Sequence, residues 1–239
     1  MSFQKTYDVR SLECDSSDHL NLWGLARFYQ DIAEAHAMSI GNGFHDLIKQ
    51  NKAWIICRMY IHIDEMPFQL ENITLKTWMR NHNGLLSMRD YQLINQEGRV
   101  VSGSTCCWAI IDYTTRRVCR LNNLIGNYEC EPEMATEFSE LDKLKSPNMD
   151  EDDCVVAFSV LPSFLDHTNH VNNAEYLRLA SDYMPNGLQN IKNTDIRIDF
   201  IAETPPNDEM KIYRKQIDQS TWFQIHNSRG ASAIVQITR

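Results

Sequence analysis

The sequence lacks the features that would place the protein in a membrane or on nucleic acid. It has no run of eighteen apolar residues, so we expect no transmembrane helix and no membrane insertion. The N-terminus, MSFQKTYDVR, lacks the apolar core of a secretory signal, which favours a cytoplasmic localisation. The formal net charge of −9 argues against a general nucleic-acid binder, which needs a dominant basic face.

Cysteine pairs with redox or metal-site spacing are also missing. The seven cysteines are an odd number and include no C-x-x-C spacing, as is typical of reduced thiols in the cytoplasm. The adjacent Cys106 and Cys107 could form a redox pair, but we favour the simpler interpretation that they are neighbours in a strand. Hydrophobic residues are plentiful, at 43% of the chain, so it can bury a substantial core.

A helix followed by antiparallel strands is the plan that residues 1–121 predict. A strand over residues 3–9 precedes a polar loop and a helix over residues 22–37, whose apolar residues recur at helical spacing after Asn21 as N-cap. Four strands follow, separated by the turn sequences NHNG and NQEG, over residues 54–64, 72–80, 85–94 and 99–112. Alternation in the first of them predicts five residues on one face: Ile55, Cys57, Met59, Ile61 and Ile63.

The same plan restarts after an acidic segment. Residues 122–153 are acidic and irregular, which predicts a linker that its charge keeps solvated. A strand over residues 154–160, a polar loop and a helix that starts near Ala174 and ends before Pro185 come next. Four strand candidates complete the chain, over residues 194–202, 209–217, 221–227 and 231–238.

A shared motif supports an internal duplication. Residues 15–21 and 166–172 both read Asp-x-x-x-His-(Leu/Val)-Asn, each directly before a predicted helix. We therefore predict an α+β fold of two tandem units, residues 1–121 and 154–239, each a curved antiparallel sheet wrapped around a long helix. Side by side, the two units could share a continuous sheet and so hide their edge strands.

The second copy of the motif concentrates polar chemistry at the start of a helix. A helix N-terminus exposes unpaired backbone N–H groups and a positive dipole end, which can stabilise an oxyanion formed from a carbonyl group. Beside it, the carboxylate of Asp166 or the imidazole of His170 could orient and deprotonate a water molecule. The loop LDHTNHVNN therefore favours hydrolysis of an activated acyl group.

Two other interpretations of this loop stay open from residue types alone. In the first, Asn172 or Asn173 only caps the helix and Asp166 only holds the loop, a structural role that is about as well supported. In the second, His167 and His170 begin a zinc site, but no cluster of further ligands has suitable spacing. We therefore expect no metal and no cofactor.

The first copy of the motif differs where its helix begins. Leu22 and Trp23 stand where the second copy has Asn173 and Ala174. A bulky tryptophan at a helix start suggests that the first copy serves binding or packing, so a variant lacking His19 should stay active.

The stretch LDHTNHVNNAEYLRL resembles the D-x-N-x-H-V-N-N-x-x-Y motif of plant and bacterial fatty acyl-ACP thioesterases. The blocks AWIICRMYIHIDEMP, ITLKTWMR and CCWAIIDYTTRRVCRL are similar to that family as well, so the resemblance covers about residues 3–237. It implies two hotdog domains, the first binding substrate and acyl chain and the second carrying catalysis. The implied activity is hydrolysis of the thioester between a fatty acyl chain and acyl carrier protein (ACP), which terminates fatty acid synthesis.

The resemblance also implies the catalytic residues, which fall on Asp166, His170 and Glu203. Two positions depart from the family pattern: Thr168 replaces the motif asparagine, and Thr204 replaces a cysteine that many members carry. A cysteine nucleophile is therefore excluded, and attack by water is expected. Which carboxylate acts as the general base is left open.

The remaining loop residues are expected to bind the substrate. Backbone N–H groups near Asn172 and Asn173 would hold the oxyanion, and Thr168 or Asn169 would supply the hydrogen bond of the missing asparagine. The acyl chain would lie in an apolar tunnel between helix and sheet.

The implied partner, acyl carrier protein, is acidic, so this acidic chain should present a local basic patch. The candidate docking residues are Arg116, Arg117 and Arg120, with Lys76, Arg80 and Arg89 behind them. The alternative is that Arg116 and Arg117 only sit in a solvated turn. Homodimer formation stays open.

Three rival functions are compatible with the fold, because function depends on the site. They are hydrolysis of coenzyme A esters, dehydration, and non-catalytic binding of acyl thioesters. A non-catalytic sensor usually carries an attached output module, and the 239 residues leave no room for one.

Overall fold

A computed structural model describes residues 2–121 and 130–239 of the chain. The first half contains β1 (Phe3–Asp8), α1 (Leu22–Ser39), α2 (Phe44–Ile48), β2 (Lys52–Glu65), β3 (Asn72–His82), β4 (Leu86–Ile94) and β5 (Val100–Asp112). The second half contains β6 (Cys154–Ser159), α3 (Asn173–Asp182), β7 (Lys192–Phe200), β8 (Glu209–Ile217), β9 (Ser220–Asn227) and β10 (Gly230–Thr238). Short 3₁₀ turns precede the helices, at Ser11–Glu13 and Pro162–Phe164.

All ten strands belong to one antiparallel sheet, in the order β1-β3-β4-β5-β2-β7-β10-β9-β8-β6. The second half runs through its strands in the reverse of the order used by the first, so the halves are related by an approximate twofold axis. They join where β2 pairs with β7, for example Met59 opposite Ile198. The predicted α+β fold with two helix-and-sheet units and one shared sheet is confirmed.

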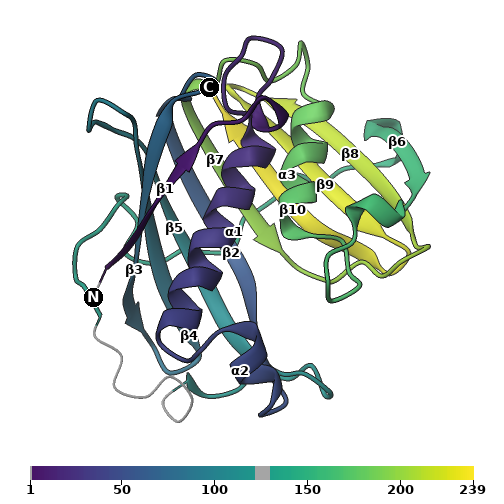
Figure 1. Cartoon of the computed structure of the whole chain (residues 1–239). Helices are drawn as coiled ribbons and strands as arrows, with labels where there is room; N and C mark the ends of the chain where they lie inside the picture. The colour runs from purple at the N-terminus through teal and green to yellow at the C-terminus, as the bar shows by residue number, and fades with distance from the viewer. Residues whose placement is uncertain (1, 122–129) are drawn as a thin grey trace.

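Helices α1 and α3 lie side by side on one face of this sheet (Figure 1). The apolar side of α1 is buried against the sheet at Leu25, Tyr29 and Ile32, as its 3.6-residue spacing predicted. Asn21 caps α1, because its side-chain oxygen accepts a hydrogen bond of 2.7 Å from the Gly24 N–H. No helix within residues 2–121 or 130–239 is long and apolar enough to cross a membrane.

A β-bulge in β2 overturns one predicted face. The register with β5 shifts between Ile56 and Arg58, so one extra residue separates the two ends of the strand. Cys57 consequently packs on the outer face of the sheet, in contact with Tyr60 and Cys107, and not on the helix side with Met59. The expectation that Cys57 shares a face with Met59 is therefore wrong.

Cys106 and Cys107 are neighbours in β5 that point to opposite faces of the sheet. Cys106 belongs to the core beneath the helices, whereas Cys107 belongs to the outer cluster, and both thiols are free. The interpretation as strand neighbours is confirmed, and the vicinal redox pair is not formed.

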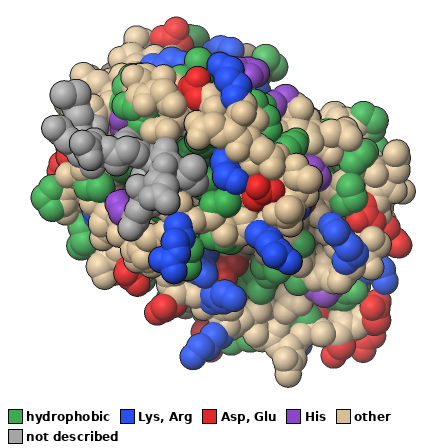
Figure 2. Space-filling view, turned by 90° about the horizontal axis from the view of Figure 1, so that it is seen from below, with side chains coloured by type: hydrophobic (Ala, Val, Ile, Leu, Met, Phe, Trp, Pro, Cys, Tyr) green, Lys and Arg blue, Asp and Glu red, His purple; other side chains and the backbone are tan. Residues whose placement is uncertain are grey.

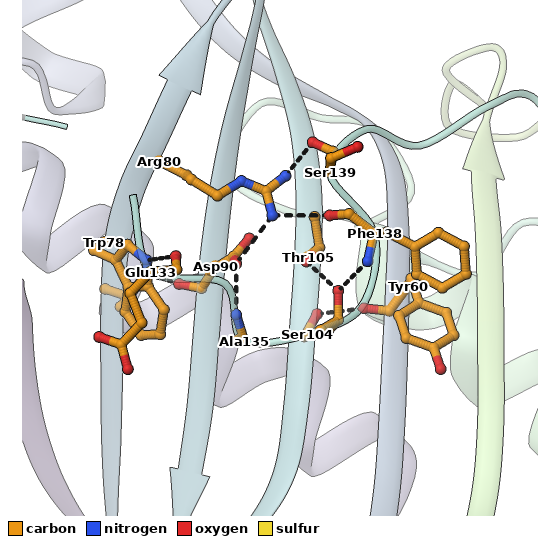
Figure 3. A network of polar contacts seen from close by, with 12 residues as sticks. Tyr60, Trp78, Arg80, Asp90, Ser104, Thr105, Glu133, Ala135, Phe138 and Ser139 are labelled. Atoms are coloured by element: carbon orange, nitrogen blue, oxygen red, sulfur yellow. Dashed lines mark hydrogen bonds and ion pairs between the residues drawn. The ribbon is translucent and has the colours of Figure 1, made fainter. Parts of the chain in front are cut away.

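The described part of the predicted acidic linker, residues 130–153, is exposed at most of its residues, but it lies against the outer face of the sheet. Its first part contacts the first half, where Trp78 Nε1 donates to the Glu133 carbonyl at 2.8 Å (Figure 3). Its last part contacts the second half, where the Leu144 N–H donates to the Asp199 carboxylate at 2.9 Å. Within the segment, the side chains of Leu141 and Leu144 are buried. A Cβ at Gly103 would lie 2.4 Å from the Ala135 carbonyl oxygen, so only glycine permits this approach. Residues 122–129 of the predicted linker lie outside the described residues.

A buried ion pair fastens this segment to the sheet. Arg80 and Asp90 face each other at 3.4 Å, with 3% and 0% of their side chains exposed. Arg80 also donates to the carbonyls of Phe138 (2.8 Å) and Ser139, and Asp90 accepts from the Ala135 N–H at 2.8 Å (Figure 3). The pairing and hydrogen bonds offset only part of the burial cost, because Arg80 Nε and Asp90 Oδ1 have no partner among the described residues and burial raises the pKa of Asp90 above its usual value.

Arg80 and Arg89 therefore do not belong to a surface patch, and the expectation that they support a docking face is wrong. Both are 5% exposed. Arg89 donates to His36 Nδ1 at 2.9 Å and to Thr77 Oγ1 at 3.2 Å, beneath β3 and α1. Lys76 is partly exposed and pairs with Glu133 at 3.2 Å.

Replacing Asp90 by alanine should strongly destabilise the fold, because it leaves the Arg80 guanidinium buried without a carboxylate. We expect the free energy of unfolding, measured by urea denaturation, to fall by about 3–5 kcal/mol. Glu133→Ala is the control, because the Glu133 side chain is 54% exposed and its ion pair with Lys76 should contribute at most about 1 kcal/mol. Equal losses in the two variants would contradict the fastening role.

Candidate active site

A cavity of about 400 Å³ lies where the two halves of the molecule meet. The first half contributes walls from α2, β2 and β5, and the second contributes the polar loop, the start of α3 and the segment after β7. The apolar side chains that line it include Phe44, Trp54, Ile56, Trp108, Tyr176 and Phe200. The polar ones that matter below are Arg116, Asp166, Thr168, His170, Asn173 and Glu203.

Hydrogen bonds within the polar loop fix three of these side chains. Asp166 Oδ1 accepts from the Thr168 hydroxyl at 2.6 Å and from the Thr168 N–H at 2.8 Å. The same hydroxyl lies 3.4 Å from Nδ1 of His170. Asn169 closes the turn in the left-handed conformation (φ 63°), and the Asp166 N–H donates to the His170 carbonyl at 2.9 Å. Asp166 therefore anchors the loop and, through Thr168, orients the His170 ring.

Glu203 meets His170 from the opposite wall. Its Oε2 lies 3.6 Å from Nε2 of His170, and its Oε1 is paired with the guanidinium of Arg116. The Glu203 and Arg116 side chains remain 42% and 36% exposed, so this group of charges lies at the solvent end of the cavity. The structure thus brings Asp166, His170 and Glu203 to one site.

His170 is held neutral by its surroundings. Partial burial lowers the pKa of its imidazole, the positive charges of Arg116 and then Arg229 lower it further, and Asp166 opposes them. Because an ordinary histidine has a pKa of about 6.5, this ring is uncharged at neutral pH and can accept a proton.

The four residues expected to bind substrate divide into two groups. Thr168 and Asn173 line the cavity. Asn172 is the N-cap of α3, because its side-chain oxygen accepts from the Ala174 N–H at 2.8 Å, and Asn169 is exposed in its turn. The structural interpretation therefore holds for Asn172, and the functional one is favoured for Asn173.

Thr204, at the position of the family's cysteine, is fully buried. Its hydroxyl lies 2.9 Å from the Tyr176 hydroxyl and 3.4 Å from Nδ2 of Asn227. Its role is to fix the segment that carries Glu203, whose own carbonyl accepts from Arg229 at 2.7 Å.

The metal interpretation of the two histidines finds no support. His167 packs edge-on against the Phe44 ring at 4.7 Å, whereas His170 faces Glu203. Within the part of the chain that the structure describes, no group of three or more His, Cys, Asp or Glu residues is arranged to hold a metal ion.

The first copy of the motif folds into the same loop. Asp15 Oδ1 accepts from the Ser17 hydroxyl at 2.6 Å, and that hydroxyl lies 3.2 Å from Nδ1 of His19. Asp18 takes the left-handed conformation (φ 61°) that Asn169 takes in the second copy. The duplication inferred from sequence therefore extends to individual hydrogen bonds.

The first copy lacks the partner of its histidine. In the second copy the Val171 N–H donates to the Thr204 carbonyl, directly after Glu203; in the first, the Leu20 N–H donates to the Pro67 carbonyl, directly after Met66. A buried methionine thus replaces the carboxylate.

The two copies also differ in the first residues of the helix that follows each loop. Leu22, which is buried, fills the position of Asn173. Trp23 Nε1 donates to Glu175 of α3 at 2.8 Å, so the tryptophan joins the two helices. The hypothesis that the first copy serves packing is supported.

Sequence reasoning missed two contributors to the site. One is α2, whose Phe44 closes a wall of the cavity, and the other is the contact of Arg116 with Glu203 across the two halves. No local pattern marks either, because both depend on how the halves pair.

Comparison with known proteins agrees with this architecture. Residues 1–127 match the family described as acyl-ACP thioesterase N-terminal domain, and residues 148–238 match acyl-ACP thioesterase C-terminal domain. Fold and site define a double-hotdog protein with a hydrolase-like polar cluster. The chain belongs to the acyl-ACP thioesterase family.

Solved structures share the whole fold. An acyl-ACP thioesterase from Bacteroides thetaiotaomicron superimposes with a TM-score of 0.86 at 20% identity, covering 99% of this chain and 97% of that one. The 12:0-ACP thioesterase from Umbellularia californica gives a TM-score of 0.83 at 16% identity, covering 99% and 96%.

Curated relatives are longer than this chain. The palmitoyl-acyl carrier protein thioesterase of Gossypium hirsutum is 26% identical over 192 residues, which is 73% of this chain and 45% of that protein. The chain spans about half the length of the curated relatives it matches.

The two copies of the motif can be separated by mutating each histidine. His170→Ala should lower kcat/KM for acyl thioester hydrolysis by roughly 10²–10⁴-fold, the usual contribution of a positioned acid–base group. His19→Ala, in the copy whose carboxylate position is Met66, should stay within about twofold of the wild type, given the structural role of that loop. Comparable losses in two correctly folded variants, checked by circular dichroism, would show that the first copy takes part in the reaction.

Proposed function

We propose that the protein hydrolyses the thioester that joins a fatty acyl chain to acyl carrier protein and so terminates fatty acid synthesis. The observation that carries this proposal is the group of His170, Glu203 and Asp166 at the solvent end of an otherwise largely apolar cavity. Membership of the acyl-ACP thioesterase family supports it. Such a cavity suits a ligand with one reactive polar end and a long apolar tail.

The acyl chain would extend inward between the helices and the sheet. A smaller cavity of about 20 Å³ shares Ile56, Trp108, Asn173 and Phe200 with the main one. It continues to Tyr29 of α1 and Tyr91 of β4, whose rings lie 4.7 Å apart and form an aromatic floor. The tail would therefore enter the first half while its thioester stays beside the second.

Hydrolysis would begin with attack of water on the thioester carbonyl carbon. Glu203 is the better candidate for the base, because its Oε2 faces the site, whereas Asp166 Oδ1 is occupied by two hydrogen bonds from Thr168. The water oxygen forms the new C–O bond and its proton passes to Glu203.

The tetrahedral oxyanion would be held at the start of α3. The Asn173 N–H is one of the terminal donors with no partner inside the helix, and the positive end of the helix dipole points the same way. The C–S bond then breaks, and the proton that Glu203 took from water passes by way of His170 to the leaving thiolate, which departs as the free thiol of the carrier while Glu203 and His170 return to their starting charges. No thiol nucleophile is needed, since Thr204 occupies that position and is buried.

Two variants test whether Glu203 is the general base and Asp166 only holds the loop in place. Glu203→Gln should lower kcat by roughly 10²–10⁴-fold, because it removes the proton acceptor. Asp166→Asn retains a side-chain oxygen for the Thr168 donors, so its loss should be about tenfold or less. Steady-state release of free thiol measures both, and full turnover in the two variants would refute the assignment of the site.

Exposed arginines beside the cavity would receive the acidic carrier. Figure 2 looks at the end of the molecule where α2 lies in Figure 1, and Lys and Arg side chains recur across its middle, with most acidic ones toward the rim. Arg116, Arg117 and Arg120 are exposed in the segment after β5. A local positive field of this kind accelerates encounter with an acidic partner despite an unfavourable net charge.

Charge reversal at Arg117 and Arg120 tests this docking surface. The double variant Arg117→Glu and Arg120→Glu should raise KM for the carrier-linked substrate by roughly 5–20-fold at low salt and leave kcat unchanged. Lys192→Glu, at the end of β7 far from the cavity, is the control for reversing a positive charge elsewhere on the surface. An unchanged KM in the double variant would show that these arginines do not dock the carrier. In a separate comparison, equal turnover of coenzyme A esters and carrier-linked esters by the wild type would favour the rival function as a coenzyme A thioesterase.

A further inference from the structure

Arg116 connects the two halves of the molecule at the reacting group. It belongs to the turn that follows β5, in the first half, and its guanidinium pairs with Oε1 of Glu203 in the second. The guanidinium also lies 5.3 Å from the centre of the Tyr113 ring, which limits its movement. Arg117, the next residue, makes no such contact with Glu203.

The backbone of Arg116 is unusual for an arginine. Its φ of +58° lies in the left-handed region, at a turn position where glycine or asparagine is preferred. The turn is fixed on both sides, because the Arg116 N–H donates to the Asp112 carbonyl at 2.8 Å and the Asp112 N–H donates to the Arg117 carbonyl at 2.8 Å. An arginine held in this conformation is more easily explained by what its side chain does than by the turn itself.

The charges around His170 show what that side chain does. The charged groups that face the imidazole are Asp166 on its own loop, Glu203 after β7, Arg229 between β9 and β10, and Arg116 from the first half. Arg116 is thus the one member of this group supplied by the other half. It draws one carboxylate oxygen of Glu203 to itself and leaves the other oriented toward His170.

We propose that Arg116 is a positioning residue of the hydrolytic site, acting through Glu203 and His170 and not only through carrier docking. This rests on the proposed function. The guanidinium selects which oxygen of Glu203 receives the proton of water, and its charge adds to burial in lowering the pKa of His170. The active site is then composite, and the second half is incomplete without the first.

The experiment compares Arg116→Gly, which suits the left-handed backbone, with Arg116→Lys, which keeps the charge. Lys49→Met is the matched control, because Lys49 is an exposed cation next to the cavity-lining helix α2 and forms no ion pair with any described residue. Each protein is assayed with acyl carrier protein esters and with an acyl N-acetylcysteamine thioester, which carries neither the carrier nor a phosphate. Thermal unfolding of each variant is measured in parallel.

A positioning role predicts that Arg116→Gly lowers kcat on both substrates by roughly 10–100-fold, with KM for the small thioester within about twofold of wild type. The acidic limb of its pH–rate profile should move to higher pH, because loss of a neighbouring cation raises the pKa of His170. Arg116→Lys should recover part of kcat, and Lys49→Met should match the wild type. If glycine loosens the turn, Arg116→Asn, which also tolerates this backbone, replaces it.

Two results would overturn the inference. One is a loss confined to KM for the carrier-linked ester, which would make Arg116 a docking residue only. The other is an unchanged kcat and pH profile in a folded variant. If the wild-type protein released no thiol from either substrate, the proposed function itself would fail, independently of Arg116.

Discussion

Strands β2 and β7 pair antiparallel from Arg58 opposite Asp199 to Glu65 opposite Lys192, and the site depends on this pairing. It fuses two sheets into one and sets α1 beside α3 on the same face. The end of β7, which leads to Glu203, thereby lies near the start of β2 and the turn after β5. A cavity with walls from both halves and charges from both follows directly from that register.

Duplication explains why the molecule has two similar loops, although only the second has a carboxylate beside its histidine. Both loops use an aspartate, a hydroxyl and a histidine in the same hydrogen-bonding arrangement. They differ in what lies beside the histidine, which is the carboxylate of Glu203 in the second half and the ring of Phe68, at 5.3 Å, in the first. In the first half this loop serves packing. The first half contributes to the site through cavity walls, the aromatic pair Tyr29 and Tyr91, and Arg116.

Local patterns predicted most of the helices and strands, because side-chain periodicity records which face is buried. The polar loop before α3 was also visible from its residues, whereas Glu203 was found only through the family resemblance. The bulge at Cys57 and the pairing of Arg116 with Glu203 depend on contacts between distant segments, so no local pattern could show them. The acidic composition of residues 130–153 did not indicate that Leu141 and Leu144 would be buried against the sheet, because that burial depends on contacts with distant strands.

The central claim is that water, oriented between Glu203 and His170, attacks the thioester directly. A single-turnover reaction in ¹⁸O-labelled water, with acyl carrier protein ester as substrate and excess protein, tests it most directly. The account predicts one ¹⁸O atom in the carboxylate of the released fatty acid and none in the Glu203 peptide. Unlabelled fatty acid together with ¹⁸O in Glu203 would reveal an acyl-enzyme anhydride and contradict it.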